Sequence, residues 1–339
     1  MTLPAPVWKP ALNVTRASHV ALSVRDLNVS RQFYTEVIGL IVTREDEETL
    51  YLRGIEEACH HSLVLRKSAA SPTCARIGLR VQTEGDLDIA QDWFAAQGLE
   101  ARFAEVAHQG RTLQVTDPVG VPLEFCAQMP AQERQITNFL AHRGGCGQRI
   151  DHYQMLTPRV PEALAFYAAM GFRLSEYLGP SEEDIRGVFL QRKGNPHDIV
   201  FFTGEGPRLH HFAYFSPEVH HLLRACDVAG ALGFGRDVER GPGRHGPGHA
   251  MYVYFRDPDG HRVELFNTHY QIMDLENEPV RWDPADPNVS FPWGLPAQSR
   301  WFDEATCFEG ADLVAPNPRP IPLTLEAFLA ARTQGKSGS

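Results

Sequence analysis

The chain has 339 residues, of which 43% are hydrophobic and 22% are charged, and its formal net charge is -10. The length accommodates about two domains with sizeable cores, and the composition is that of a globular protein. The negative charge disfavours a nucleic-acid partner, because binding to a phosphate backbone depends on Lys and Arg side chains. We find neither an apolar run of membrane-spanning length nor a basic leader before an apolar core, so we predict no membrane segment and expect the cytoplasm.

Strand-like and helical patterns alternate along the first half. Residues 18–24 alternate as a strand, residues 28–38 have helical spacing, and three strand-like runs follow. A second unit of the same order begins with a strand at 77–81 and continues with a helix from about residue 86 to 97. A polar connector over residues 129–148 separates this half from the next.

The second half repeats the same order twice, over residues 150–202 and 209–266. A glycine-rich loop, residues 239–248, precedes its last two strands. After residue 267 the periodicity is lost, and prolines interspersed with tryptophan and phenylalanine predict a wrapping lid over residues 269–334. The small, polar tail at 335–339 is expected to be disordered.

An internal repeat relates the two halves. In each half a histidine precedes a Phe-Tyr pair by fourteen residues, and an Asp that opens a DPxG motif precedes a glutamate by seven. The matched positions are His19 and His152, Phe33 and Phe166, Asp117 and Asp257, and Glu124 and Glu264. Repeats on this scale indicate duplicated structural units that share one core plan.

The second half contains a candidate metal site. His152, His211 and Glu264 each lie in a strand-like run. Two imidazoles and one carboxylate on one face of an octahedral metal leave three positions open, as in non-haem Fe(II) oxygenases. The first half has no histidine between residues 61 and 108, where the middle ligand should be. We therefore predict a scaffold in the first half and the site in the second. From spacing alone, a packed polar group remains the alternative for each residue.

Three collinear runs carry a family resemblance: GPRLHH at 206–211, ERGPGRHG at 239–246 and DPDGHRVE at 257–264. Over about residues 15–305 the chain resembles type I extradiol catechol dioxygenases of the vicinal oxygen chelate superfamily, and within them the homoprotocatechuate 2,3-dioxygenase branch. The resemblance implies an α+β fold of four βαβββ modules forming two open barrel-like domains. The domain at 15–128 would lack metal, and the domain at 149–268 would be catalytic. It also implies Fe(II), with Mn(II) as the alternative, and a homotetramer.

The resemblance assigns roles to residues outside the triad. His197 would donate a proton to bound dioxygen and then assist ring cleavage, which suits a side chain that titrates near neutrality. Tyr254 would hydrogen-bond the deprotonated substrate oxygen. His245 and Arg240, in the glycine-rich loop, match residues near the substrate, although a surface role stays open for both. Strand alternation places His210 on the face opposite to its neighbour and indicates a structural role.

The chain departs from this branch around the predicted substrate. Gln154 replaces an Asn, Phe189 replaces a Trp, and the sequence around Val289 and Phe291 replaces an arginine pair that grips the substrate carboxylate. Each lost charge-assisted hydrogen bond is worth about 1.5–3 kcal/mol. We therefore predict a catechol with a neutral substituent, which Phe189, Val289 and Phe291 would line. Arg281 is the candidate for a substitute charge.

The predicted function is extradiol cleavage of a substituted catechol, which places both atoms of O2 in a 2-hydroxymuconic semialdehyde-type product. The first alternative is a homoprotocatechuate 2,3-dioxygenase proper. The second is a glyoxalase-like isomerase or lyase, whose Zn(II) or Ni(II) sites in the superfamily usually have four protein ligands. The third, a binder related to bleomycin-sequestering proteins, is disfavoured by the intact triad.

Overall fold

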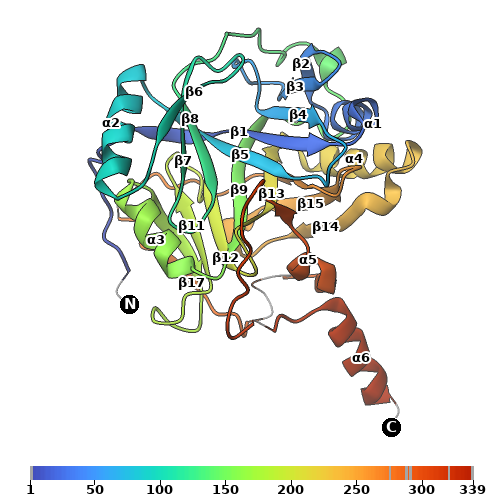
Figure 1. Ribbon diagram of the computed structural model, residues 1–339. Coiled ribbons are helices and arrows are strands. Elements are labelled where there is room, and N and C mark those ends of the chain that lie inside the picture. The colour runs from blue at the N-terminus through green and yellow to red at the C-terminus, as the bar shows by residue number, and fades with distance from the viewer. Residues whose placement is uncertain (1–2, 275, 287–288, 290–291, 320, 337–339) are drawn as a thin grey trace.

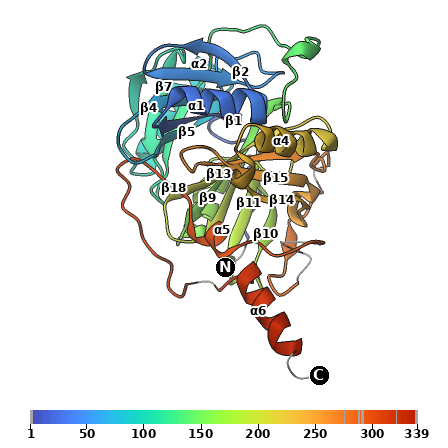
Figure 2. The same ribbon diagram turned by 90° about the vertical axis from the view of Figure 1, so that its right-hand side faces the viewer.

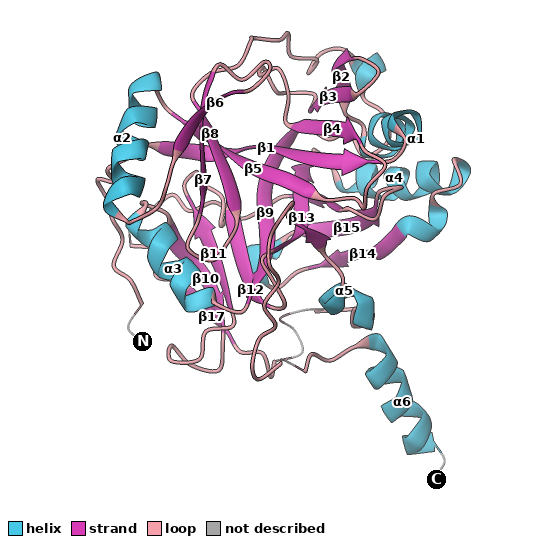
Figure 3. Cartoon of the chain, viewed as in Figure 1, coloured by secondary structure: helices cyan, strands magenta, loops and turns pink. Residues whose placement is uncertain are grey.

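The computed structural model describes residues 3–274, 276–286, 289, 292–319 and 321–336. The first half forms two modules, each a strand, a helix and three strands (Figures 1 and 3). The first module contains β1 (Val14–Val24), α1 (Leu27–Gln32), β2 (Ile41–Glu45), β3 (Thr49–Arg53) and β4 (Leu63–Lys67). The second contains β5 (Cys74–Val81), α2 (Glu84–Ala96), β6 (Arg102–Glu105), β7 (Arg111–Thr116) and β8 (Pro122–Cys126).

The second half forms two further modules of the same order. One contains β9 (Arg149–Thr157), α3 (Val160–Ala169), β10 (Arg173–Leu178), β11 (Gly187–Gln191) and β12 (Ile199–Thr203). The other contains β13 (Arg208–Phe215), α4 (Val219–Ala231), β14 (Val238–Arg244), β15 (Met251–Arg256) and β16 (Arg262–Asn267). The predicted α+β fold of four βαβββ modules is confirmed.

Each half builds one sheet, and the order of its strands brings distant parts of the sequence together. The first sheet has the order β2-β3-β4-β1-β5-β8-β7-β6, and the second has β14-β15-β16-β13-β9-β12-β11-β10-β17. The two sheets lie one above the other in Figure 2. In the second sheet β16, β13 and β9 are neighbours, so residues more than a hundred positions apart meet on one face.

Local sequence explains where the elements begin and end. Thr83 and Asp86 form a capping box, which starts α2 at Glu84, slightly before the predicted boundary. The helical pattern at 28–38 becomes α1 and a π-helical segment, η1 (Phe33–Ile38), which ends at Gly39 with a φ of 85°.

Two predictions of local structure need correction. Residues 239–244 of the predicted glycine-rich loop belong to β14, which pairs with β15 through Val238 and Phe255 and through Arg240 and Tyr254. The ladder shifts register between Arg240 and Gly243, which accommodates the glycines. The tail predicted from residue 335 begins inside helix α6 (Leu325–Lys336), while residues 337–339 lie outside the described residues.

The segment predicted to wrap the second half contributes secondary structure of its own. Strand β17 (Val280–Trp282) extends the second sheet parallel to β10, and β18 (Thr306–Cys307) pairs with β13. Helix α5 (Ser299–Asp303) lies between them in sequence. Helix α6 projects away from the sheets in Figures 1 and 2. None of the described helices is long and apolar enough to cross a bilayer.

The repeated motifs connect the two halves reciprocally. Tyr34, from the first Phe-Tyr pair, donates a hydrogen bond of 2.9 Å to Asp257 in the DPDG turn of the second half. Tyr167, from the second pair, donates one of 2.9 Å to Asp117 in the DPVG turn of the first half. Each aspartate also accepts backbone N–H groups of its own turn. Because both motifs recur in each half, two equivalent hydrogen bonds join the halves.

The first half holds an ion pair where the second half holds its triad. His19 Nε2 lies 2.5 Å from Glu124 Oε1, and both side chains are buried. Arg76 on β5 pairs with Ala21 on β1, two residues after His19. In the second half, His211 on β13 pairs with Gln154 on β9, two residues after His152. An arginine thus occupies the position of the middle ligand in this half.

This pair predicts a pH-dependent stability. Burial lowers the pKa of His19, but interactions with Cys126 and Glu124 outweigh burial and raise it to about 9. The contribution of the histidine is complete below its ordinary value of 6.5 and is lost as pH rises toward 9. Burial raises the pKa of Glu124, but hydrogen bonds from His19 and its neighbours lower it to about 2, so its contribution is lost only below 4.5.

Replacing His19 by glutamine should lower the free energy of unfolding by about 3 kcal/mol near pH 6, because Glu124 is left as an unpaired buried charge. The difference between wild type and variant should shrink between pH 7 and pH 9. Urea denaturation followed by circular dichroism measures it. A difference that stays constant from pH 6 to 9 would contradict a stabilising ion pair.

Candidate metal centre

The three predicted ligands converge on one face of the second sheet. His152 lies on β9, His211 on β13 and Glu264 on β16. The Nε2 atoms of both histidines lie 3.2 Å from Glu264 Oε2. All three side chains are at most 3% exposed, and one ligand atom from each lies within 4.8 Å of the others.

The electrostatics of this cluster favour a cation. Burial alone would raise the pKa of Glu264, but hydrogen bonds from His152, His211 and His245 keep it well below 4.5. Burial lowers the pKa of His211 to about 4, so this imidazole is neutral at pH 7. The hydrogen bonds of His152 to Asp151 and Glu264 overcome burial and raise its pKa to about 9. A divalent cation would take the place of that proton, since metal binding releases protons from its ligands.

Neighbouring groups orient both histidines through their second nitrogens. His152 Nδ1 lies 3.0 Å from Asp151 Oδ2, and Asn195 donates to the same oxygen. His211 Nδ1 lies 2.8 Å from His210 Nδ1, and His210 Nε2 lies 2.9 Å from the carbonyl oxygen of Trp301. Such outer partners fix the tautomer and the ring orientation of a metal-ligating histidine.

The prediction that His210 points to the opposite face is wrong. The ladder between β13 and β9 shifts register between Leu209 and His211. A bulge of this kind breaks the strict alternation of side chains, and it brings His210 beside His211.

The three residues predicted to act beside the triad, His197, Tyr254 and His245, lie close to it. The ring of His197 lies 4.4 Å from that of His152, centroid to centroid, and nothing in the described part of the chain hydrogen-bonds its Nδ1. On the other side Tyr254 Oη and His245 Nε2 are 2.8 Å apart, and His245 Nε2 lies 3.7 Å from Glu264 Oε1. Burial and the charge of Glu264 raise the pKa of Tyr254 well above 10, so its hydroxyl remains protonated.

Four of the five predicted substrate contacts lie among the described residues. Gln154 faces His211 across the β9–β13 ladder, and the ring of Phe189 lies 5.3 Å from that of His197. The Arg240 guanidinium lies 4.6 Å from the centroid of the Trp301 ring. Val289 is buried, and its carbonyl oxygen accepts a hydrogen bond from Gly246 in the loop before β15. Phe291 lies outside the described residues.

A protein-family model, the Glyoxalase/Bleomycin resistance protein/Dioxygenase superfamily, matches residues 16–125 and 149–265, one match in each half. The chain belongs to this superfamily. A crystallographic structure of an extradiol ring-cleaving dioxygenase from B. fuscum aligns with a TM-score of 0.87 and 35% identity, covering 93% of this chain and 90% of that one. The prediction of a type I extradiol dioxygenase is therefore confirmed.

Curated relatives of this extradiol dioxygenase differ in name, and one of them is named as manganese-dependent. The manganese-dependent 2,3-dihydroxybiphenyl 1,2-dioxygenase of Geobacillus genomosp. 3 is 28% identical over 83% of this chain and 93% of that protein. The metapyrocatechase of Geobacillus stearothermophilus is 26% identical over 91% of this chain and 98% of that protein. The family implies a catalytic metal, and the buried set of two imidazoles and one carboxylate fits a divalent cation.

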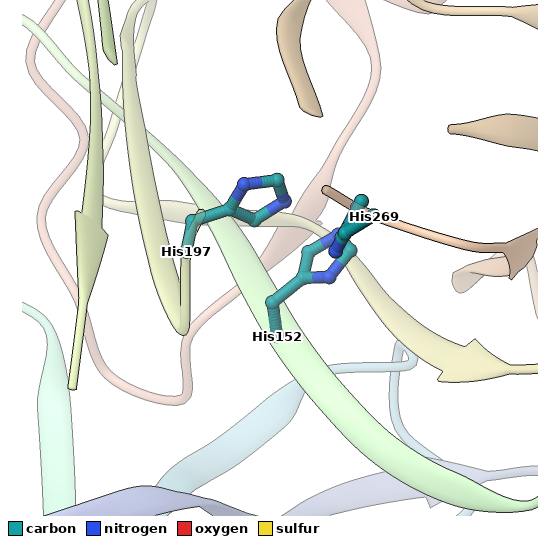
Figure 4. A group of neighbouring side chains, drawn as sticks. All are labelled: His152, His197 and His269. Atoms are coloured by element: carbon teal, nitrogen blue, oxygen red, sulfur yellow. The ribbon is translucent and has the colours of Figure 1, made fainter. Parts of the chain in front are cut away.

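Sequence reasoning missed one histidine beside the centre of this extradiol dioxygenase. His269 is buried, and a ligand atom of His269 lies within 4.8 Å of one each from His152 and His197 (Figure 4). Its ring stacks on Phe266 at 4.3 Å. His269 follows the last strand, where periodicity is lost, and the repeat offers no counterpart. Its spacing of five residues from Glu264 was the only available signal.

Proposed function

We propose that this extradiol dioxygenase opens the ring of a catechol with a neutral substituent and uses Fe(II) or Mn(II) held by His152, His211 and Glu264. Both atoms of O2 would enter a 2-hydroxymuconic semialdehyde-type product. The observation that carries the proposal is the convergence of these three buried ligands beside His197 and Tyr254. Three protein ligands leave positions for other molecules, whereas a four-ligand set would favour an isomerase.

The side chains around the centre suit this reaction. When bound, the metal would supply adjacent coordination positions for the two catechol oxygens and for dioxygen. Tyr254, which pairs with His245, would hydrogen-bond a deprotonated substrate oxygen. His197 would hold and return a proton beside the metal, since its Nδ1 has no partner among the described residues. Phe189 would exclude water on that side through its contact with His197.

Oxygen consumption tests the reaction class. Protein loaded with Fe(II) or Mn(II) without air, mixed with catechol and then exposed to air, should consume one O2 per catechol and form a yellow ring-opened product. An isomerase, lyase or simple binder would consume none. Metal analysis of protein reconstituted with each ion, together with the turnover of each form, distinguishes Fe(II) from Mn(II).

The C-terminal segment supports a neutral substituent. Arg281 donates to the carbonyl oxygens of Gly179 and Pro180 and pairs with Asp283 at 3.6 Å. Its guanidinium is thus engaged in the turn after β10. Val289, which packs beside the loop that carries His245, brings an aliphatic side chain where the related branch has an arginine.

We predict that kcat/KM for catechol and methylcatechols exceeds that for 3,4-dihydroxyphenylacetate by about tenfold or more, because each missing charge-assisted hydrogen bond is worth about 1.5–3 kcal/mol. Steady-state oxygen uptake with a substrate panel measures this ratio. A ratio that favours the carboxylate would instead support a homoprotocatechuate 2,3-dioxygenase proper.

We also propose a homotetramer in the cytoplasm. Exposed apolar side chains support assembly, among them Phe139 and Leu140 in the connector and Ile321 before α6. All six cysteines are free, which suits a reducing compartment. Sedimentation equilibrium measures the number of subunits.

A further inference from the structure

Glu176, on β10, is a fully buried carboxylate outside the triad. In the described part of the chain its carboxylate forms no ion pair. It accepts hydrogen bonds from one backbone N–H group and from two side chains. Burying a carboxylate without a cation is costly unless hydrogen bonds replace its hydration. The three donors therefore replace the water that would otherwise hydrate this carboxylate.

The partners of Glu176 come from two separate segments. The Gly248 N–H lies 3.0 Å from Oε1 and 3.2 Å from Oε2. Tyr270 Oη donates to Oε1 at 2.6 Å, and Trp282 Nε1 donates to Oε2 at 2.8 Å. Gly248 belongs to the loop that follows His245, while Tyr270 and Trp282 belong to the C-terminal segment. One carboxylate thus ties both segments to β10.

Gly248 carries this attachment to the metal centre. It has a φ of +66°, a left-handed conformation that glycine adopts without strain. A Cβ built on it would lie 3.1 Å from His269 Cδ2 and 3.3 Å from His197 Cε1, so its backbone packs directly against both rings. The position of this glycine therefore limits where His197 can lie.

Glu176 also lies between the strands that flank the site. It faces Phe189 across the β10–β11 ladder and Val280 across the β10–β17 ladder. Phe189 in turn contacts the ring of His197. A displacement of the Glu176 carboxylate would therefore move His197 through Gly248 and through Phe189.

We propose that Glu176 is a positioning residue that fastens the Gly248 loop and the C-terminal segment to β10 and thereby holds His197 in place for proton transfer. Its link to catalysis rests on the function proposed above. A carboxylate accepts from all three donors as they stand. A glutamine has one acceptor oxygen. Its NH2 group would face either the Trp282 N–H, which cannot accept, or the Tyr270 hydroxyl, which would have to turn from donor to acceptor.

The test compares Glu176→Gln with Tyr270→Phe, which removes a donor from Oε1, and Trp282→Phe, which removes one from Oε2. Glu182→Gln is the matched control, because Glu182 is exposed in the turn after β10. Metal content and thermal unfolding of every variant are measured first. Hydrogen exchange by mass spectrometry then follows peptides that cover residues 246–252 and 270–282, and oxygen uptake gives kcat and KM for catechol.

Glu176→Gln should lower kcat by about ten- to a hundredfold, the scale expected when a catalytic group moves by a fraction of an ångström to an ångström. KM and metal content should change little, and both peptides should exchange faster. Tyr270→Phe and Trp282→Phe should speed exchange mainly in the C-terminal peptide and lower kcat less. Unchanged exchange in Glu176→Gln would overturn the anchoring role, and faster exchange with wild-type kcat would overturn the positioning role.

The exchange measurement separates this inference from the proposed function. If the wild-type protein cleaved no catechol, the reaction would be wrong, yet faster exchange in Glu176→Gln would still support the anchor. If the wild type cleaved catechol and Glu176→Gln matched it in both readouts, only the anchor would be wrong.

Discussion

Replacing Glu264 by glutamine should remove most of the metal from the protein and lower ring-cleaving activity by more than about 100-fold. Loss of an outer partner of a metal ligand already costs about 10–100-fold in affinity or activity. Glu264 supplies the only negative charge of the triad and lies within 3.2 Å of both histidine nitrogens. A neutral amide provides neither that charge nor the same geometry. Plasma mass spectrometry gives the metal content, and oxygen uptake with catechol gives the activity.

The duplicated half supplies a matched control for this substitution. Glu124 faces Gly78 across β5 and β8, as Glu264 faces Ala213 across β13 and β16. Glu124→Gln should retain metal and activity, although it removes the ion pair with His19 and lowers stability. If Glu264→Gln kept its metal, or if both variants lost it equally, the metal would not be held where we propose.

The second large effect concerns His197. His197→Asn should lower kcat by about 10²–10⁴-fold, the usual contribution of a general acid or base, while metal content stays near that of the wild type. His197 lies beside His152 but outside the triad, so its loss should affect proton transfer more than metal binding. Oxygen uptake at saturating catechol measures kcat, and metal analysis on the same sample checks occupancy.

The equivalent residue of the first half again provides the control. His61 lies two residues before Leu63, and Leu63 pairs with Val20, the residue after His19. In the same way, His197 lies two residues before Ile199, and Ile199 pairs with Tyr153, the residue after His152. His61→Asn should therefore leave kcat unchanged. Equal losses in both variants would point to damage of the fold and away from proton transfer.

The triad and the modules could be predicted because they depend on regular strands. Each ligand sits in a strand-like run, and the family resemblance implied the fold of four modules in which these runs converge. The structure places them on the neighbouring strands β16, β13 and β9. Once that plan is known, the register brings His152, His211 and Glu264 together. The same alternation of side chains predicted the wrong face of β13 for His210, because the sequence pattern does not reveal the bulge between Leu209 and His211.

The surroundings of the triad were less predictable because they depend on irregular backbone. Glu176 lies in strand β10, whose sequence has no motif that marks a site. Its partners come from a glycine turn and from a segment without periodicity. His269 follows the last strand of the repeat and has no counterpart in the first half. Tertiary contacts between loops leave little trace in local patterns.

The reciprocal bonds from Tyr34 to Asp257 and from Tyr167 to Asp117 have the form of an isologous interface, in which residue i of one copy contacts residue j of the other and the reverse. The chain is thus built like a symmetric dimer whose two subunits have become covalently joined. In a true homodimer every substitution occurs in both copies. Covalent fusion removes that constraint, so the first copy can carry Arg76 at the position where the second carries His211.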